Sequence, residues 1–169
     1  HVAVWLAQHG AERVTATDLR PGPLRSARES AERYGVADRV RFVLADGLQY
    51  PGAESADTVI VAGMGGETME AILSRAAWTR AARLVLQPQT RLDELCLWLR
   101  REGYALGGAV LAREGERLYA VLSVAGGDEG YAWAEDALLA AADPLLPAWT
   151  EHRRRAALTA LEGKSRARV

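Results

Sequence analysis

Two acidic residues follow two successive predicted strands, and their chemistry suits a nucleoside. Asp18 ends the short predicted strand of residues 13–18, and Asp46 follows the next predicted strand, residues 39–44. An ionised carboxylate offers two acceptor oxygens, so Asp18 can accept both hydroxyls of a ribose. Asp46 can accept from the exocyclic amine of an adenine, and Gly47 leaves the backbone open to the ring. Taken singly, Asp18 could instead cap a turn, and Asp46-Gly47 could simply be a turn. Because the two acids lie one strand apart, together they favour a nucleoside site.

The third candidate is a glycine-rich segment after the strongest strand signal in the chain. Residues 57–61 are apolar and β-branched, and the following residues are Ala62, Gly63, Met64, Gly65 and Gly66. Glycines let a ligand approach the main chain closely, and open α/β sheets bind ligands beyond the carboxyl ends of their strands. We therefore expect a strand, a glycine loop that contacts a ligand, and a helix over residues 67–75. The alternative is a tight strand-to-helix turn without a ligand.

The elements that must position these residues alternate between helix and strand. Besides those already named, the sequence predicts helices over residues 1–9, 24–34, 92–101 and 146–161, a strand over 83–86, a breaker at Pro21-Gly22-Pro23, and a hairpin of residues 104–112 and 117–124. Alternating apolar strands and helices predict an α/β, Rossmann-like, mostly parallel doubly wound sheet that ends in an antiparallel hairpin. This is the layout of class I S-adenosylmethionine-dependent methyltransferases rather than of nicotinamide dehydrogenases.

The 169 residues, 49% of them hydrophobic, are enough for one sizeable core. We expect a main domain over residues 1–126, whose first strand would precede His1, and a short C-terminal helical appendage over residues 127–169. The sequence shows no membrane-spanning run and no signal peptide. A single Cys96 and three scattered histidines predict neither a disulfide nor a metal site, which fits the cytoplasm.

Charge is unevenly distributed along the chain. The net charge is −1, but residues 151–169 carry +4 and the remainder −5. A basic tail on an acidic body favours contact with a polyanion, although the same pattern is found at solvated helix ends.

Four blocks of the sequence resemble the bacterial TrmK family. They are TDLRPGPLRSA (residues 17–27), VAGMGGETM (61–69), LVLQPQTRLDELCLWLRREGYAL (84–106) and EGERLYAVLSV (114–124). Members of that family are tRNA (adenine-22-N1) methyltransferases that use S-adenosylmethionine. The combination of AGMGG with LQPQ at this spacing is much more specific than a lone glycine motif.

The resemblance implies a role for each candidate residue. Those expected to bind the cofactor are His1, Asp18, Asp46, Gly47, Ala62 and Gly63. Those expected at the catalytic centre are Gly63, Met64, Gly65 and Gly66. Those expected to contact the tRNA are Met64, Gln87, Pro88, Gln89, Arg153, Arg154 and Arg155.

The implied reaction needs no general base. Adenine N1 has an in-plane lone pair and attacks the methyl group without prior deprotonation, so catalysis reduces to alignment. The glycine segment would supply acceptors for the N6 amine and a wall for the flipped base. Two alternatives remain open: a class I methyltransferase acting on another RNA base or a small molecule, and a non-catalytic domain that binds RNA or a partner.

Overall fold

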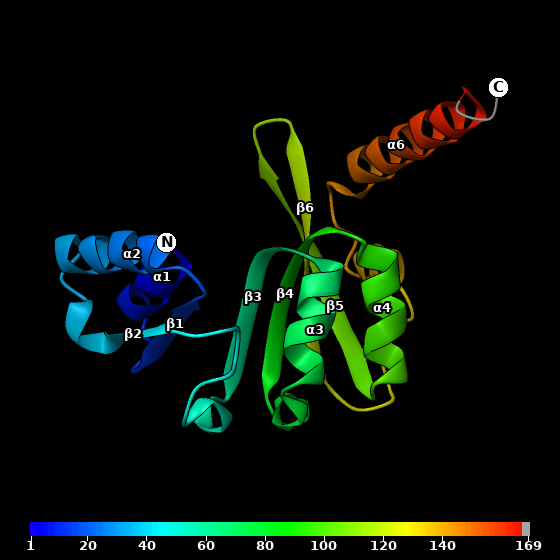
Figure 1. Cartoon of the computed structure of the whole chain (residues 1–169). Helices are drawn as coiled ribbons and strands as arrows, with labels where there is room; N and C mark the ends of the chain where they lie inside the picture. The colour runs from blue at the N-terminus through cyan, green and yellow to red at the C-terminus, as the bar shows by residue number, and fades with distance from the viewer. Residues whose placement is uncertain (167–169) are drawn as a thin grey trace. The chain divides into compact units, whose positions relative to one another are not determined.

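The computed structural model describes residues 1–166, with side chains described through Leu161. Its internal contacts divide the chain into two compact units (Figure 1). Unit 1 comprises residues 1–56 and 71–77, and unit 2 comprises residues 57–70 and 78 onwards. Each unit is a layer of strands covered by helices.

Unit 1 is built on a two-stranded parallel sheet. Its main elements are α1 (Val2–Gln8), β1 (Val14–Asp18), α2 (Pro21–Arg33) and β2 (Val40–Leu44). Asp18 pairs with Leu44, so the two strands end side by side. The core between sheet and helices is apolar: Val4, Ala7, Ala31, Val36 and Val40 are buried, and Phe42 packs against them. These elements match the predicted ones except at the start of α2.

The prediction that Pro21-Gly22-Pro23 breaks the chain is wrong, because α2 begins at Pro21. Proline is disfavoured in a helix interior, where its missing N–H and its ring break the hydrogen-bond ladder. In the first turn that N–H has no intrahelical partner, and the fixed φ of proline already suits a helix. The segment is therefore a helix start.

Unit 2 contains a four-stranded sheet in the order β3-β4-β6-β5. Its strands are β3 (Thr58–Gly65), β4 (Arg83–Thr90), β5 (Tyr104–Glu114) and β6 (Arg117–Gly126). β3 and β4 are parallel, whereas β6 is antiparallel to both β4 and β5. Parallel strands closed by an antiparallel hairpin, with a C-terminal helix after them, confirm the predicted fold class.

Four helices accompany this sheet. They are α3 (Gly66–Ser74), which passes from unit 2 into unit 1, α4 (Leu92–Arg101), α5 (Ala134–Ala140) and α6 (Leu146–Arg166). α4 buries Leu92, Leu95, Cys96 and Leu99, the spacing that places apolar residues on one helix face. They join Leu84, Leu86 and Leu122 of the sheet and Leu138 of α5 in the core of unit 2.

The outer edge of β5 is partly covered. The Leu111 N–H donates to the Asp143 carboxylate at 2.8 Å, and the Tyr131 N–H donates to the Leu106 carbonyl at 2.9 Å. The segments before α5 and before α6 thus satisfy backbone groups that the sheet itself leaves unpaired.

Candidate functional site

The glycine segment is part of a strand, which corrects the prediction of a loop. β3 continues through Gly65, and α3 begins at the next residue, Gly66. Pairing with β4 is irregular here: Ala62 faces Gln87, Met64 faces Pro88, and Gly63 has no partner in the register. Gly63 is therefore an extra residue in its strand, a bulge, and its φ of +77° is one that glycine adopts without strain.

β4 is also longer than predicted and includes Gln87, Pro88 and Gln89. The sequence suggested that Pro88 ends the strand, because proline gives no N–H to a sheet. Pairing of β4 with β6 ends at Leu86, opposite Leu122, so beyond this point β4 has only β3 beside it. Proline is tolerated at such edges and bulges.

A side chain of β4 holds the bulge of β3. The Gly63 N–H donates to Gln87 Oε1 at 2.9 Å, and Gln87 Nε2 donates to the Pro88 carbonyl at 3.4 Å. The next side chain on β3, Met64, is 39% exposed. An apolar thioether is thus presented to solvent at the point where the sheet becomes irregular.

Gly65 and Gly66 are small for a reason other than ligand access. A Cβ on Gly65 would lie 2.9 Å from Thr90 Oγ1, and a Cβ on Gly66 would lie 2.7 Å from the Arg91 carbonyl oxygen. The Arg91 backbone therefore leaves no room for a side chain at Gly66, and the Thr90 hydroxyl crowds one at Gly65. Arg91 is itself unusual, with a φ of +57°, and forms ion pairs with Glu67 and Glu94.

In unit 1, Asp18 serves partly as the turn cap that the sequence left open as an alternative. Its Oδ1 accepts from the Arg20 N–H at 2.8 Å, directly before α2. Oδ2 has no hydrogen bond to any residue that the structure describes. One oxygen is committed to the turn and the other is open, at the carboxyl end of β1.

Asp46 and Gly47 lie after β2 in unit 1 and contact the last residues of α3 and those just after it. Arg75 Nη1 lies 2.7 Å from Asp46 Oδ2, and this hydrogen bond holds the pKa of the Asp46 carboxyl below its usual range. Gly47 has a φ of +59°, and a Cβ there would lie 2.9 Å from Ile72. Both the backbone conformation and the space therefore require glycine at position 47.

His1 lies at the surface of unit 1. His1 is exposed and precedes α1, where its carbonyl accepts from the Trp5 N–H at 3.0 Å. Within the described part of the chain, histidine, cysteine and acidic side chains form no cluster of three or more suited to a metal ion. None of the described helices has the length and hydrophobicity that a bilayer crossing requires.

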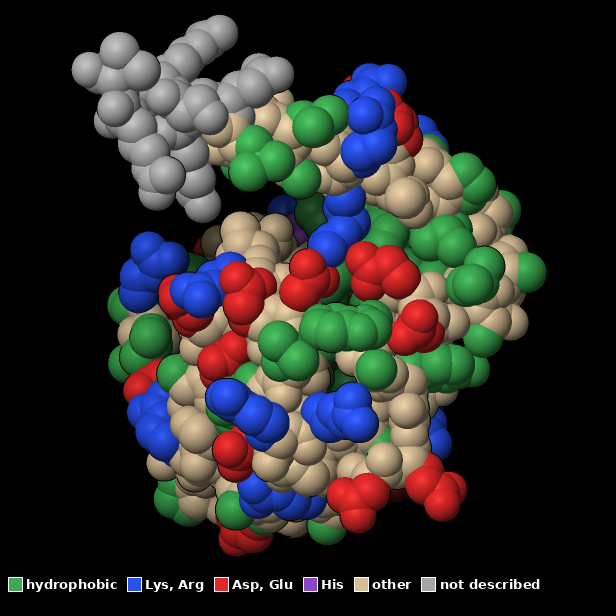
Figure 2. Space-filling model, turned by 90° about the vertical axis from the view of Figure 1, so that its right-hand side faces the viewer, with side chains coloured by type: hydrophobic (Ala, Val, Ile, Leu, Met, Phe, Trp, Pro, Cys, Tyr) green, Lys and Arg blue, Asp and Glu red, His purple; other side chains and the backbone are tan. Residues whose placement is uncertain are grey.

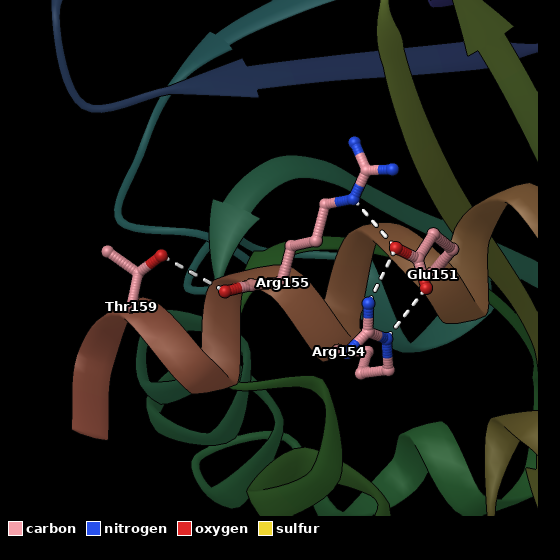
Figure 3. A network of polar contacts seen from close by, with 4 residues as sticks. All are labelled: Glu151, Arg154, Arg155 and Thr159. Carbon is pink, nitrogen blue, oxygen red and sulfur yellow. Dashed lines mark hydrogen bonds and ion pairs between the residues drawn. The ribbon is translucent and has the colours of Figure 1, made fainter. Parts of the chain in front are cut away.

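The three arginines predicted to contact tRNA all bind carboxylates of unit 2. Glu151 accepts from Arg154 Nε and from Arg155 Nε, each at 2.7 Å and one turn along α6. Figure 3 shows these contacts. These hydrogen bonds lower the pKa of Glu151 to about 2. Arg153 Nη2 donates to both oxygens of Asp93, at 2.8 and 2.7 Å, and its guanidinium lies over the buried ring of Trp149.

A groove runs between the irregular end of the sheet and α6. Its volume is about 540 Å³, and it is lined by Pro88, Gln89, Arg117, Tyr119, Trp149 and His152 among others. Arg117 forms no ion pair with a described residue. Figure 2 shows basic and acidic side chains interspersed on the face that carries α4 and α6, with the surface hollowed beneath α6. Within the part of α6 whose side chains are described, the three arginines thus all have carboxylate partners.

The sequence analysis did not predict that Arg75 would contact Asp46, or that Thr90 and Arg91 would contact the glycines at the end of β3. Arg75 closes the predicted α3 helix, and nothing in its sequence position indicates that it returns to Asp46 across 29 residues. Thr90 and Arg91 follow the LQPQ block directly. These two residues lie between Pro88 and the helix that begins at Leu92. A short connection at this place indicates that the end of β4 could pass close to the glycines.

The sequence profile of a family described as methyltransferase domain matches residues 1–122. The chain belongs to the methyltransferase domain family. Within this family its resemblance to TrmK is confirmed: over 127 residues the methyltransferase chain is 32% identical to the tRNA (adenine(22)-N(1))-methyltransferase of Bacillus subtilis strain 168. That alignment covers 74% of the chain and 53% of the Bacillus enzyme. The chain therefore spans about half the length of this relative.

Two solved structures extend the comparison. The crystal structure of TrmK from B. subtilis has a TM-score of 0.72 at 27% identity, covering 89% of this methyltransferase chain and 70% of that protein. A candidate tRNA (m1A22) methyltransferase of Streptococcus pneumoniae, solved in complex with S-adenosyl-L-methionine, has a TM-score of 0.80 at 24% identity, covering 94% and 78%. The second likeness supports the fold alone.

Proposed function

We propose that this methyltransferase transfers a methyl group from S-adenosylmethionine to N1 of an adenine in tRNA, at the position equivalent to adenine 22. The observation that carries the proposal is the bulged strand end of Ala62 to Gly66, which offers main-chain groups and one thioether but no acid or base. A nitrogen that already has an in-plane lone pair suits such a site, because nothing must deprotonate it. The named activity of the Bacillus relative agrees with this chemistry.

The residues of unit 1 fit the nucleoside half of the cofactor. Asp18 has one carboxylate oxygen without a described partner at the end of β1, ready to accept from ribose hydroxyls. Gly47 adopts a left-handed conformation in the turn after β2, where a side chain would strike Ile72. Asp46 would accept from the adenine amine once Arg75 releases it. His1, in the same unit, remains a proposed cofactor contact.

The chemistry follows from these assignments. The bound cofactor supplies a methyl group on a sulfonium, whose C–S bond breaks as the adenine N1 lone pair forms the new C–N bond, so sulfur keeps the electron pair and the base becomes cationic. Met64 and the backbone of Gly63 to Gly66 hold the base and accept from its N6 amine. These residues would align the adenine N1 with the methyl group. Holding two reacting groups in the right geometry can account for a large part of a rate enhancement.

The RNA strand beside the target base would follow the groove under α6. Gln89 and Pro88 lie at its start, and Arg117 and His152 line its sides. Arg154 and Arg155 have 60% and 75% of their side chains exposed, so both can still reach phosphates despite their contact with Glu151. Arg153 would have to release Asp93 before it contacts RNA. A tRNA substrate places the enzyme in the cytoplasm.

The test is methyl transfer from labelled S-adenosylmethionine to unmodified tRNA, followed by mapping of the modified base. A tRNA with guanine at position 22 is the matched control. We expect one methyl group per tRNA on N1 of adenine 22 and none on the control. Methylation of another base or of a small molecule would support the alternative of a class I methyltransferase with a different substrate. Cofactor binding without transfer to any RNA would contradict the proposed methyltransferase activity.

A further inference from the structure

The bulge in β3 creates a backbone donor that the sheet cannot satisfy. Gly63 lies between Ala62, which faces Gln87, and Met64, which faces Pro88, so it has no opposite residue. An extra residue in a strand leaves its main-chain groups outside the ladder. Near the centre of a site such a group must find another partner or stay with water.

Gln87 provides that partner and uses one acceptor and one donor of its amide on the main chain. The Gly63 N–H donates to Oε1 at 2.9 Å, and Nε2 donates to the Pro88 carbonyl at 3.4 Å. Only the oxygen of an amide can meet an N–H donor, so the orientation of the Gln87 amide follows from the Gly63 contact. Both polar atoms of this half-buried side chain therefore bind the main chain of the two strands, which fixes the direction of the amide.

We propose that Gln87 is a positioning residue that fixes the Gly63 bulge and thereby the direction of Met64, and that it does not contact the RNA base directly. The expected effect on methyl transfer rests on the proposed function, whereas the bond between Gln87 and Gly63 does not. Without the bond, Gly63 would be free to leave its left-handed conformation. Because side chains alternate across a strand, a change of register at this point would turn Met64 to the other face.

Three variants separate positioning from direct contact. Gln87→Glu keeps an acceptor oxygen for Gly63 and loses the Nε2 donor, whereas Gln87→Met keeps the length of the side chain and loses the acceptor. Gln8→Met makes the same chemical change on the exposed face of α1. We expect Gln87→Met to lower kcat for methyl transfer about 10- to 100-fold, since small misplacements of aligned groups cost rates of this order. Cofactor affinity and the KM for tRNA should change less than about threefold, with Gln87→Glu and Gln8→Met near wild type.

An amide exchange measurement makes the test independent of the reaction. In the purified protein without RNA, the Gly63 amide should exchange about three- to tenfold faster in Gln87→Met than in the wild type, and Gln87→Glu should restore protection. Gln87→Ala repeats the comparison if a melting curve shows that Gln87→Met does not fold.

The outcomes are distinct. Equal loss of kcat in Gln87→Glu and Gln87→Met would overturn the proposal in favour of direct contact through Nε2. Unchanged Gly63 exchange in Gln87→Met and Gln87→Ala, or unchanged kcat in an active enzyme, would also overturn it. An inactive wild type with the expected exchange pattern would refute the proposed function and leave the bond between the strands established.

Discussion

The Arg75 guanidinium donates to the Asp46 carboxylate at 2.7 Å in unit 1, so the acid predicted to accept from an adenine already has a partner. Both side chains are nearly half exposed, which keeps the ion pair in contact with water. Such pairs are weak, because solvent screens them and two long side chains must be ordered. If Asp46 accepts from the adenine as proposed, Arg75 would compete with the cofactor without excluding it.

Replacing Arg75 should strengthen cofactor binding. We expect Arg75→Gln to lower the Kd for S-adenosylmethionine by up to about fivefold, since the exposed pair is worth little and its loss frees Asp46. Calorimetric titration checks this, with Arg25→Gln on the exposed face of α2 as the control. A weaker affinity in Arg75→Gln would mean that Arg75 orients Asp46 for the adenine.

Asp18 should be essential for cofactor affinity. Asp18→Ala removes the carboxylate and should weaken binding by about 1.5–3 kcal/mol, the usual range for hydrogen bonds to a charged group. Asp18→Asn keeps an acceptor for the Arg20 N–H, so it separates the turn cap from the ribose contact. Asp38→Ala, on an exposed 3-10 turn, is the matched control. Equal affinities of Asp18→Ala and the wild type would exclude the ribose role.

The glycines at the end of β3 should differ in their tolerance of a methyl group. Gly66→Ala would place its Cβ against the Arg91 backbone, which cannot rotate away, so we expect a loss of about 1–3 kcal/mol in unfolding free energy. Gly65→Ala meets only the Thr90 hydroxyl and should cost less, with Thr90→Ala restoring most of the loss. Gly108→Ala has free space and is the control. Urea denaturation distinguishes these variants, and equal costs for Gly65→Ala and Gly66→Ala would contradict the packing account.

Gly65→Val should abolish methyl transfer, and either of two steric effects of the valine could cause this loss. A valine at this position would fill the slot proposed for the acceptor base and would also strike Thr90. We expect no methyl transfer by Gly65→Val and cofactor affinity near that of the wild type. If Gly65→Val with Thr90→Ala recovers activity, the base slot lies elsewhere.

The Glu151 carboxylate should titrate far below an ordinary glutamate. Its two arginine partners lower its pKa to about 2 from an ordinary 4.5. For a carboxyl group with a lowered pKa, the stabilisation by the ion pairs is complete above about pH 4.5 and is lost as the pH falls towards 2. Carbon-detected NMR titration of the carboxyl checks this. Arg154→Gln with Arg155→Gln should return the pKa of Glu151 towards 4.5, and an unchanged pKa in that variant would rule out the contacts.

Arg117 and Arg153, which both line the groove under α6, should affect the salt dependence of tRNA binding differently. Arg117→Ala removes a cation with no described ion pair, and we expect the slope of log tRNA affinity against log salt to fall by about 0.7–0.9. Arg153→Ala should leave the slope unchanged and lower the melting temperature, because it loses Asp93, Glu135 and the Trp149 ring. Fluorescence titrations at several salt concentrations measure both slopes. A slope that falls only in Arg153→Ala would mean that Arg153, and not Arg117, makes the phosphate contact in this groove.

The fold was predictable because its signals are local and periodic. The apolar runs of β1 to β4 and the spacing of Leu92, Leu95 and Leu99 each follow from which side chains must be buried. The ends of β3 and β4 were not predictable in this way. Gly63 and Pro88 ordinarily end strands, and here each is accommodated by its neighbour, the bulge by Gln87 and the proline by the end of pairing with β6.

In the candidate site, too, features set by neighbouring residues were predictable, and contacts between residues far apart in the sequence were not. The turn after Asp18 and the turn at Asp46-Gly47, with its left-handed glycine, are local features, and the sequence offered both turns as alternatives to a ligand role. Arg75 at Asp46 and Arg153 at Asp93 join residues 29 and 60 positions apart. Such contacts depend on how elements pack, so a basic run in the sequence predicted free charge where the structure has ion pairs.

The contacts on β5 have a consequence for behaviour at high concentration. An edge strand of 11 residues exposes a row of N–H and C=O groups onto which another molecule could add a strand. The Asp143 carboxylate occupies the Leu111 N–H, and the Tyr131 backbone occupies the Leu106 carbonyl. Edge-to-edge growth of the sheet is blocked at two points five residues apart, and the carboxylate adds a charge that a second strand would have to bury.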